Sequence, residues 1–192
     1  MTDFVRELER VYPATVKSLR RADQEDLIHQ FENFLMEDLS GVSEPARWLP
    51  LFLKTRAVPG KILQASEWEW AHFVCQIVDY GRRPLDPGQI HINPSMQFIE
   101  LHESVPDLRR DSGLYGIFVF GNRVHSRQFA LGEALLLETL HEDRKFSRSQ
   151  LIEAARIEAQ SWPQLQAVDW DSLLNEMTVA GVLTESPPAT TP

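Results

Sequence analysis

The sequence is poor in residues on which several common classes of protein depend. It contains one cysteine, Cys75, so it can form neither an internal disulfide nor a cysteine-based zinc cage. No uninterrupted apolar run approaches the roughly 20 residues of a membrane helix, and the first residues are charged where a signal peptide is apolar. We therefore expect a soluble, cytoplasmic protein that does not bind membranes.

Positive charge is also scarce. The 192 residues include 19 Lys and Arg against 28 Asp and Glu, a formal net charge of −9, and no Lys or Arg follows Arg156. Proteins that bind nucleic acids neutralise phosphates with cations, so this composition argues against a nucleic-acid partner. The apolar content of 43% is too high for a disordered chain.

Residues 1–81 have helical periodicity. The clearest helix covers residues 23–39, and further helices are expected over 46–54 and 61–80, separated by Gly and Pro. We expect four helices in all over residues 1–81, of which these three have assigned bounds, and short connections between them predict a small bundle. The apolar residues at three- and four-residue steps in the clearest helix are Leu27, Ile28, Phe31, Phe34, Leu35 and Leu39.

Proline and glycine then mark residues 82–96 as a linker, beyond which the apolar period falls towards two. Gly121 and Asn122 have the chemistry of a tight two-residue turn between two strands. We predict strands over residues 96–101, 114–120 and 123–128.

Three helices follow the strands. Ser126 is the expected cap of the first, Ser147 with Gln150 has the spacing of a capping box, and Asp169 caps the last helix, which ends at Gly181. A short strand is expected at 182–183.

The predicted fold class is therefore α+β, in two modules. Residues 1–81 form a small helical bundle, and residues 97–185 form a winged-helix-like domain of three strands and three helices. Residues 186–192 are rich in Pro and Thr and are expected to be a disordered tail.

We find no catalytic constellation and predict no catalytic or metal-binding residue. The six histidines lack the spacing of a zinc protease, no glycine-rich phosphate loop is present, and Cys75 fits a helix core better than a nucleophile. A metal enzyme that uses His91 or His102 is the least favoured class of function.

Two neighbouring residues, Trp68 and Glu69, are candidates for a partner interface. Trp68 and Trp70 lie about 200° apart around a helix, so both cannot face one core. If Trp70 is buried, Trp68 points towards a partner, where exposed tryptophans often serve as anchors. The alternative is that Trp68 packs within the protein.

Several stretches resemble a family of accessory proteins. SEWEWAHFVCQIVDYG (66–81), preceded by WLPLFLKT (48–55), is similar to the family's LEWA-containing helix and FxxFL helix. INPSMQFIELH (92–102) resembles its Pro-Ser-x-x-x-L strand, and ALGEALLLETLHED (130–143) its E-x-x-LL-x-x-L helix. The resemblance covers residues 45–180, but Trp68 stands where the family often has leucine.

The family comprises partners of multinuclear non-heme iron-dependent oxidases that modify cysteines in ribosomally made peptides, among them the C-type partner of methanobactin biosynthesis. The resemblance implies a non-catalytic subunit that captures the leader part of a precursor peptide through a winged-helix-like recognition element and forms a heterodimer with the oxidase. Iron is then expected in the partner enzyme and no cofactor on this chain. Within the family, the branch that serves 3-thiaglutamate biosynthesis is the nearest expectation.

The strand over 123–128 is the candidate peptide-binding edge, because an open strand edge can accept an extended peptide as an added strand. Alternation places Arg123, His125 and Arg127 on one face, where they suit an acidic leader, and Val124 supplies a backbone donor. These cations also suit simple protection of an edge. The apolar residues expected across the groove, from the last helix, are Leu173, Leu174 and Met177, some of which belong to the core.

The competing class is a winged-helix transcriptional regulator with a helical sensor domain. Its third helix would have to approach DNA phosphates. That helix carries Asp171 and Glu176 and no cation, which disfavours DNA binding.

Overall fold

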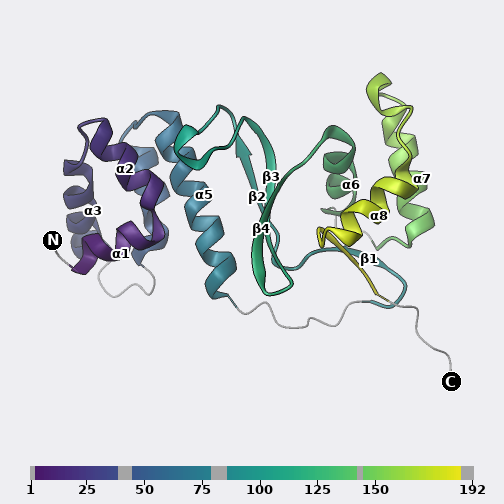
Figure 1. Ribbon diagram of the computed structural model, residues 1–192, viewed down its shortest axis with the longest axis horizontal. Coiled ribbons are helices and arrows are strands. Elements are labelled where there is room, and N and C mark those ends of the chain that lie inside the picture. Colours follow the sequence, from purple (N-terminus) through teal and green to yellow (C-terminus); the bar gives the residue numbers. More distant parts are fainter. Residues whose placement is uncertain (1–2, 39–44, 79–85, 142–144, 187–192) are drawn as a thin grey trace. The chain divides into compact units, whose positions relative to one another are not determined.

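A computed structural model describes residues 3–38, 45–78, 86–141 and 145–186 and confirms the predicted α+β class, with helices first and strands after them (Figure 1). The chain divides into two compact units. The first unit comprises Met1–Ile77 and Ile99–Gly113, and the second comprises Val78–Phe98 and Leu114–Pro192. The chain enters the second unit after Ile77, returns to the first unit between Phe98 and Ile99, and passes back to the second between Gly113 and Leu114.

The described residues of the first unit form five α-helices where the periodicity predicted four. Pro13 separates two short helices because proline fits the first turn of a helix but cannot continue one. The elements of this unit are α1 (Asp3–Val11), α2 (Pro13–Arg21), α3 (Asp26–Asp38), η1 (Pro45–Trp48), α4 (Leu49–Thr55), α5 (Gly60–Ile77) and η2 (Pro106–Leu108).

An aromatic cluster forms the core of the first unit. The ring of Phe31 lies 5.2 Å from that of Phe52, and Phe4 and Phe34 pack around them. The periodicity of α3 therefore identified its core face correctly, since Phe31 is fully buried. Such buried rings contribute strongly to stability through their large apolar area.

The segment 99–113 belongs to the first unit, which corrects the predicted boundary at residue 97. Asp107 accepts hydrogen bonds from Ser18 Oγ at 2.9 Å and Arg21 Nη1 at 2.8 Å, and Lys17 Nζ lies 3.2 Å away. Gln64 Oε1 of α5 accepts a 2.7 Å bond from the His102 amide. These contacts join residues far apart in sequence, so a local pattern could not reveal them.

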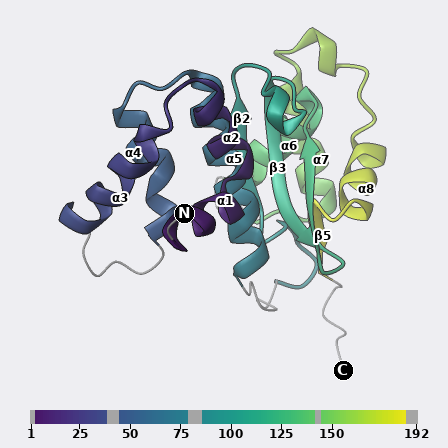
Figure 2. The ribbon, with the colours of Figure 1, turned by 60° about the vertical axis from the view of Figure 1, so that its left-hand side comes forward.

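The second unit contains the remaining strands and helices. Figures 1 and 2 both show α6, α7 and α8 gathered on one side of β3 and β4. Its elements are β1 (Ile90–Ile92), β2 (Gln97–Leu101, of which Gln97 and Phe98 belong here), β3 (Gly113–Phe120), β4 (Arg123–Gln128), α6 (Leu131–His141), α7 (Arg148–Ala159), η3 (Pro163–Leu165), α8 (Trp170–Val179) and β5 (Leu183–Glu185).

The predicted linker over residues 82–96 is wrong in its second half. Ile90–Ile92 forms β1, which pairs antiparallel with β5 so that Ile92 faces Leu183. Proline and glycine here mark turns around a short strand rather than an unstructured connection. Residues 82–85 of the linker, and all of the predicted tail except Ser186, lie outside the described residues.

The predicted turn at Gly121 and Asn122 is confirmed. Their φ angles are 57° and 61°, and positive φ at both central residues defines a type I′ turn. The turn sets the register of β3 and β4, in which Phe120 faces Arg123 and Phe118 faces His125.

Local capping signals located two of the three helix starts. Ser147 and Gln150 form the capping box of α7, and Asp169 accepts a 3.2 Å bond from the Ser172 amide at α8. Ser126, the expected cap of α6, lies inside β4 instead. At α6, Glu133 accepts a 2.8 Å bond from the Ala130 amide.

Replacing Asp107 with Asn should lower the free energy of unfolding of the first unit by about 1 kcal/mol, because its bonds to α2 are partly exposed. The Ser18 hydrogen bond, with Lys17 and Arg21, lowers the pKa of Asp107. The contribution is therefore present above the ordinary carboxyl pKa and is lost as pH falls through the lowered one. Urea denaturation across this range measures it.

The exposed Glu7 on α1 provides the control. Glu7→Gln should leave the free energy of unfolding nearly unchanged. An equal effect of the two substitutions would contradict a specific role for Asp107.

Candidate functional site

The candidate site is the outer edge of β4. The strand order is β2-β3-β4, and among the described strands β4 pairs with β3 alone. The edge strand is therefore the one that the sequence predicted.

The register determines which backbone groups of β4 point outward. Val119 on β3 donates its amide to Ser95 Oγ at 2.8 Å and accepts a 3.0 Å bond from Asn93 Nδ2 at its carbonyl. Its polar groups therefore point away from β4, so Val119 and Val124 form a non-hydrogen-bonded pair. The backbone N–H and C=O of Val124 consequently point to the outer edge of β4.

Arg123, His125 and Arg127 lie on one face of β4, as their alternation predicted. Their register partners are Phe120, Phe118 and Gly116, so they share the face on which Phe118 enters the core. The His125 ring stacks 5.9 Å from the ring of Phe118, and its Nε2 lies 3.1 Å from the Phe120 carbonyl oxygen. Arg123 is exposed.

Arg127 is engaged within the protein. Its guanidinium pairs with the carboxylate of Glu133, which is only 4% exposed and also holds the N-terminus of α6. Arg127 therefore ties β4 to α6, whereas Arg123 and His125 of the same face are exposed.

The apolar groove expected on α8 is mostly core. Leu174 and Met177 are fully buried in the hydrophobic cluster of the second unit, so Met177 is not available to a ligand, contrary to the prediction. Leu173 is half-buried and packs near Gly132 of α6. One helical face packs into the core because α8 contacts both α6 and α7.

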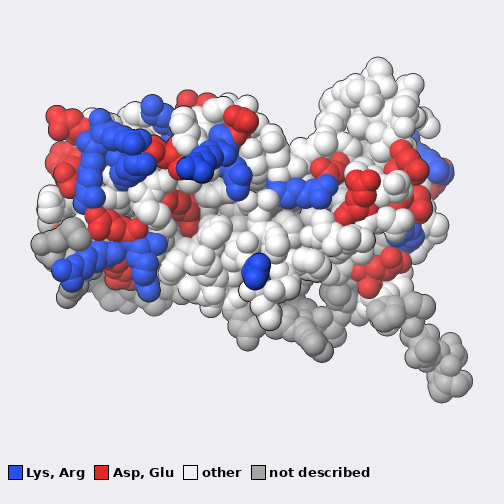
Figure 3. All heavy atoms as spheres, in the orientation of Figure 1, with Lys and Arg blue, Asp and Glu red and all other residues white. Residues whose placement is uncertain are grey.

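The acidic face of α8 is paired by a cation from another helix. Arg148 of α7 donates to Asp171 Oδ1, to the Asp171 carbonyl and to Asn175 Oδ1, at 2.9 to 3.0 Å, and lies 3.5 Å from Glu185. On the face seen in Figure 3, most of the basic side chains lie over the N-terminal helices, with acidic side chains among them.

Trp68 and Glu69 are buried within the first unit, so the predicted partner interface is wrong. Trp68 is 6% exposed, and the Arg110 guanidinium lies 5.3 Å from its ring centre. Glu69 is 7% exposed and accepts bonds from the Ala14 and Thr15 amides and from Thr15 Oγ1, at 2.6 to 2.9 Å. Because α2 and the segment 99–113 cover different faces of α5, both faces are buried.

The histidines considered for metal chemistry do not come together in one unit. His91 lies on β1 of the second unit, whereas His102 lies in the first. The described ranges contain no group of three or more His, Cys, Asp or Glu side chains suited to a metal ion. Cys75 is buried, as predicted for a core residue. Within the same ranges, no helix is both long and apolar enough to span a bilayer.

Sequence reasoning missed the residues that support the edge. Asn93 and Ser95 fix the phase of the β3–β4 ladder, and Glu133 anchors Arg127. In a capping box, a Glu at the third helical position accepts a bond from the amide of the N-cap residue, and Glu133 stands at that position of α6. The buried role of Asn93 has no local signal.

The chain matches no protein-family model and no curated protein sequence.

Glu133→Ala should lower the free energy of unfolding by about 2 kcal/mol, because it leaves the half-buried Arg127 without its carboxylate and the Ala130 amide without its acceptor. Glu138→Ala on the exposed side of α6 is the matched control and should have little effect. Denaturant unfolding compares the two variants. Equal stability of the variants would contradict the anchoring role of Glu133.

Glu69→Gln should change how stability depends on pH. Burial raises the pKa of Glu69 despite the hydrogen bonds from Ala14 and Thr15, which oppose that shift. The folded state therefore favours the neutral carboxyl, and the wild type loses stability as pH rises through the raised pKa. The variant lacks this loss.

The measurement is the free energy of unfolding of wild type minus that of Glu69→Gln, followed from acid to neutral pH. We expect this difference to fall with rising pH. A difference that stays constant or grows would show that the carboxylate is not penalised by burial.

Proposed function

We propose that this protein is a non-catalytic, cytoplasmic partner subunit. It binds the leader part of a ribosomally made precursor peptide and presents it to an iron-dependent oxidase on another chain, which modifies a cysteine of the peptide. The observation that carries the proposal is the outward-pointing backbone of Val124 on an edge strand. The resemblance to partners of such oxidases suggests the identity of the enzyme.

The chemistry of the edge suits an extended peptide. A peptide strand beside β4 can exchange backbone hydrogen bonds with Val124. These bonds give affinity that does not depend on the side chains of the peptide. Arg123 projects from the same strand and supplies positive charge to a chain whose net charge is −9. An acidic leader segment therefore finds its electrostatic complement at this strand, and charge complementarity contributes to partner selection.

Both ends of β4 are held in place by contacts within the second unit. Arg127 is fixed by Glu133 on α6, and the turn at Gly121 and Asn122 fixes the other end of β4. A preorganised strand loses less conformational freedom on binding, which favours affinity. His125 is exposed and its ring stacks on that of Phe118, so in this proposal it remains a candidate contact of the peptide.

Iron belongs to the partner enzyme in this proposal, and this chain holds no cofactor. Its role is to bind and orient the peptide. The chemical step then takes place on the oxidase, with which this chain forms a heterodimer.

Val124→Pro is the decisive variant. Proline removes an outward-pointing donor that the β3–β4 ladder does not use, so the sheet should survive. Loss of one backbone hydrogen bond of about 1 kcal/mol corresponds to roughly fivefold weaker binding of a fluorescent leader peptide in a polarisation titration. The oxidase should still co-purify with the variant.

Val124→Ala is the matched control, because it shortens the side chain and keeps the backbone donor. It should bind the leader peptide almost as the wild type does. Unchanged affinity of Val124→Pro would place the peptide elsewhere, and absence of binding by the protein and by its complex with the oxidase would refute the function. A salt-dependent shift of promoter DNA would favour the regulator class instead.

A further inference from the structure

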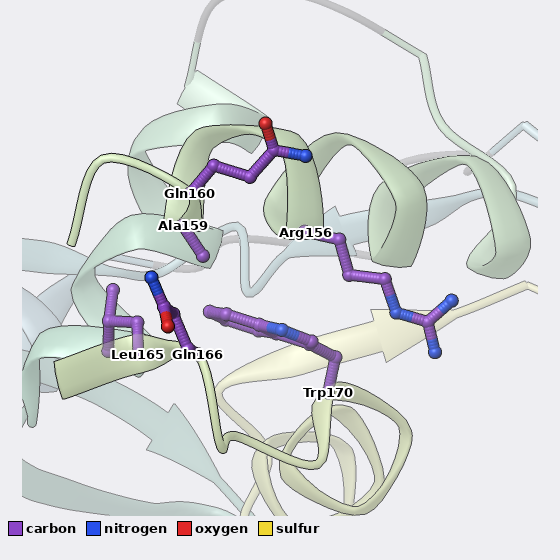
Figure 4. A pocket seen from close by; sticks show the side chains of 6 residues that line it. All are labelled: Arg156, Ala159, Gln160, Leu165, Gln166 and Trp170. Carbon is purple, nitrogen blue, oxygen red and sulfur yellow. The ribbon is translucent and has the colours of Figure 1, made fainter. Parts of the chain in front are cut away.

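The second unit contains a hollow of about 200 Å³ beside the C-terminal end of α7 (Figure 4). None of its lining residues belongs to β4, so it is separate from the candidate peptide edge. The residues that line it come from α7 and its C-cap, from η3 and the residue after it, and from the first turn of α8. They are Arg156, Ala159, Gln160, Leu165, Gln166 and Trp170.

The floor of the hollow is apolar and carries one hydrogen-bond donor. Ala159, Leu165 and Trp170 are each at most 4% exposed and belong to the core cluster of the second unit. Figure 4 shows the Trp170 indole, nitrogen included, lying flat along the hollow. The indole N–H donates to no described residue. The indole nitrogen is not enclosed by protein atoms, so its N–H can donate to a polar atom of a ligand in the hollow.

The rim is polar and contains one cation. Gln160 and Gln166 are exposed amides, and Arg156 has 61% of its side chain exposed. The Arg156 guanidinium lies 3.9 Å from Glu153 Oε2, a loose contact between two exposed side chains that contributes little. Most of the guanidinium donors therefore stay available to a ligand.

We propose that this hollow binds a carboxylate on a short aliphatic stem, such as a glutamate side chain or a small dicarboxylic acid. The guanidinium of Arg156 offers the paired donors that match a carboxylate. The indole N–H of Trp170 and the amide groups of Gln160 and Gln166 supply further donors, and the apolar floor accommodates the stem. The volume suits a single side chain or a molecule of similar size.

The test uses the full-length protein labelled with ¹⁵N and follows the indole N–H signals of its five tryptophans. Trp170→Phe identifies the Trp170 signal by its disappearance. The probes are glutarate and N-acetylglutamate N-methylamide, and N-acetylglutamine N-methylamide is the uncharged control. We expect both carboxylates to move the Trp170 signal at millimolar concentration and the amide to leave it in place.

Two matched arginine variants separate this site from the β4 edge. Arg156→Gln should weaken the response about tenfold, the loss expected for one charge-assisted pair. Arg123→Gln, at an exposed arginine of the same unit, should leave the response unchanged. A response to glutarate alone would assign the site to a free acid, and a response to the blocked glutamate as well would extend it to polypeptide side chains.

Three results would overturn the proposal. They are no movement of the Trp170 signal with either carboxylate, equal movement with the uncharged amide, and equal binding by Arg156→Gln and the wild type. None of them bears on binding of a peptide at Val124, so this proposal and the proposed function fail separately.

Discussion

The buried side chain of Asn93 is the constraint on which the second unit depends. Its Nδ2 donates to the carbonyls of Val119 and Gly181, and its Oδ1 accepts from the amide and hydroxyl of Ser95. One amide thus joins the end of β3, the end of α8 and the connection between β1 and β2. Because both polar backbone groups of Val119 are occupied by this network, the phase of the β3–β4 ladder is fixed. The outward orientation of Val124 follows from that phase.

The sequence predicted the features that depend on neighbouring residues. The type I′ turn at Gly121 and Asn122, the capping box of α7 and the Asp169 cap each need only a few residues in order. The core face of α3 follows from its period in the same way. The edge strand was also predicted correctly, because turn and alternation together define it.

The predictions that failed needed knowledge of distant contacts. Trp68 was expected at a surface, but Arg110 covers it from a segment about forty positions later. Met177 was expected in a groove, yet α8 packs on two helices and buries it. Arg127 was expected to meet a ligand, and it meets Glu133 instead. In each case the residue type was read correctly, and its partner was not visible in the local sequence.

The segment after Arg156 has no Lys or Arg of its own, but the fold brings a cation from another helix to it. Arg148, which precedes that region, reaches Asp171, Asn175 and Glu185 from α7. Arg148 of α7, which precedes the acidic segment in the sequence, therefore neutralises part of its negative charge. A count of charges along the chain gives the balance of a segment but not the balance of a surface.

The pairing of β1 with β5 has a consequence for the order in which the protein is made. The amide of Asn93 donates to the carbonyl of Val182, just before β5, so a residue near the start of the second unit finds its acceptor near the end of that unit. In the first unit, likewise, the Ser18 hydroxyl of α2 gains its acceptor only after Asp107 has been synthesised. During synthesis on the ribosome, neither unit can complete its contacts until part of the other has emerged. The first unit can therefore complete its contacts once Gly113 has emerged, whereas the second unit must wait for Leu183–Glu185.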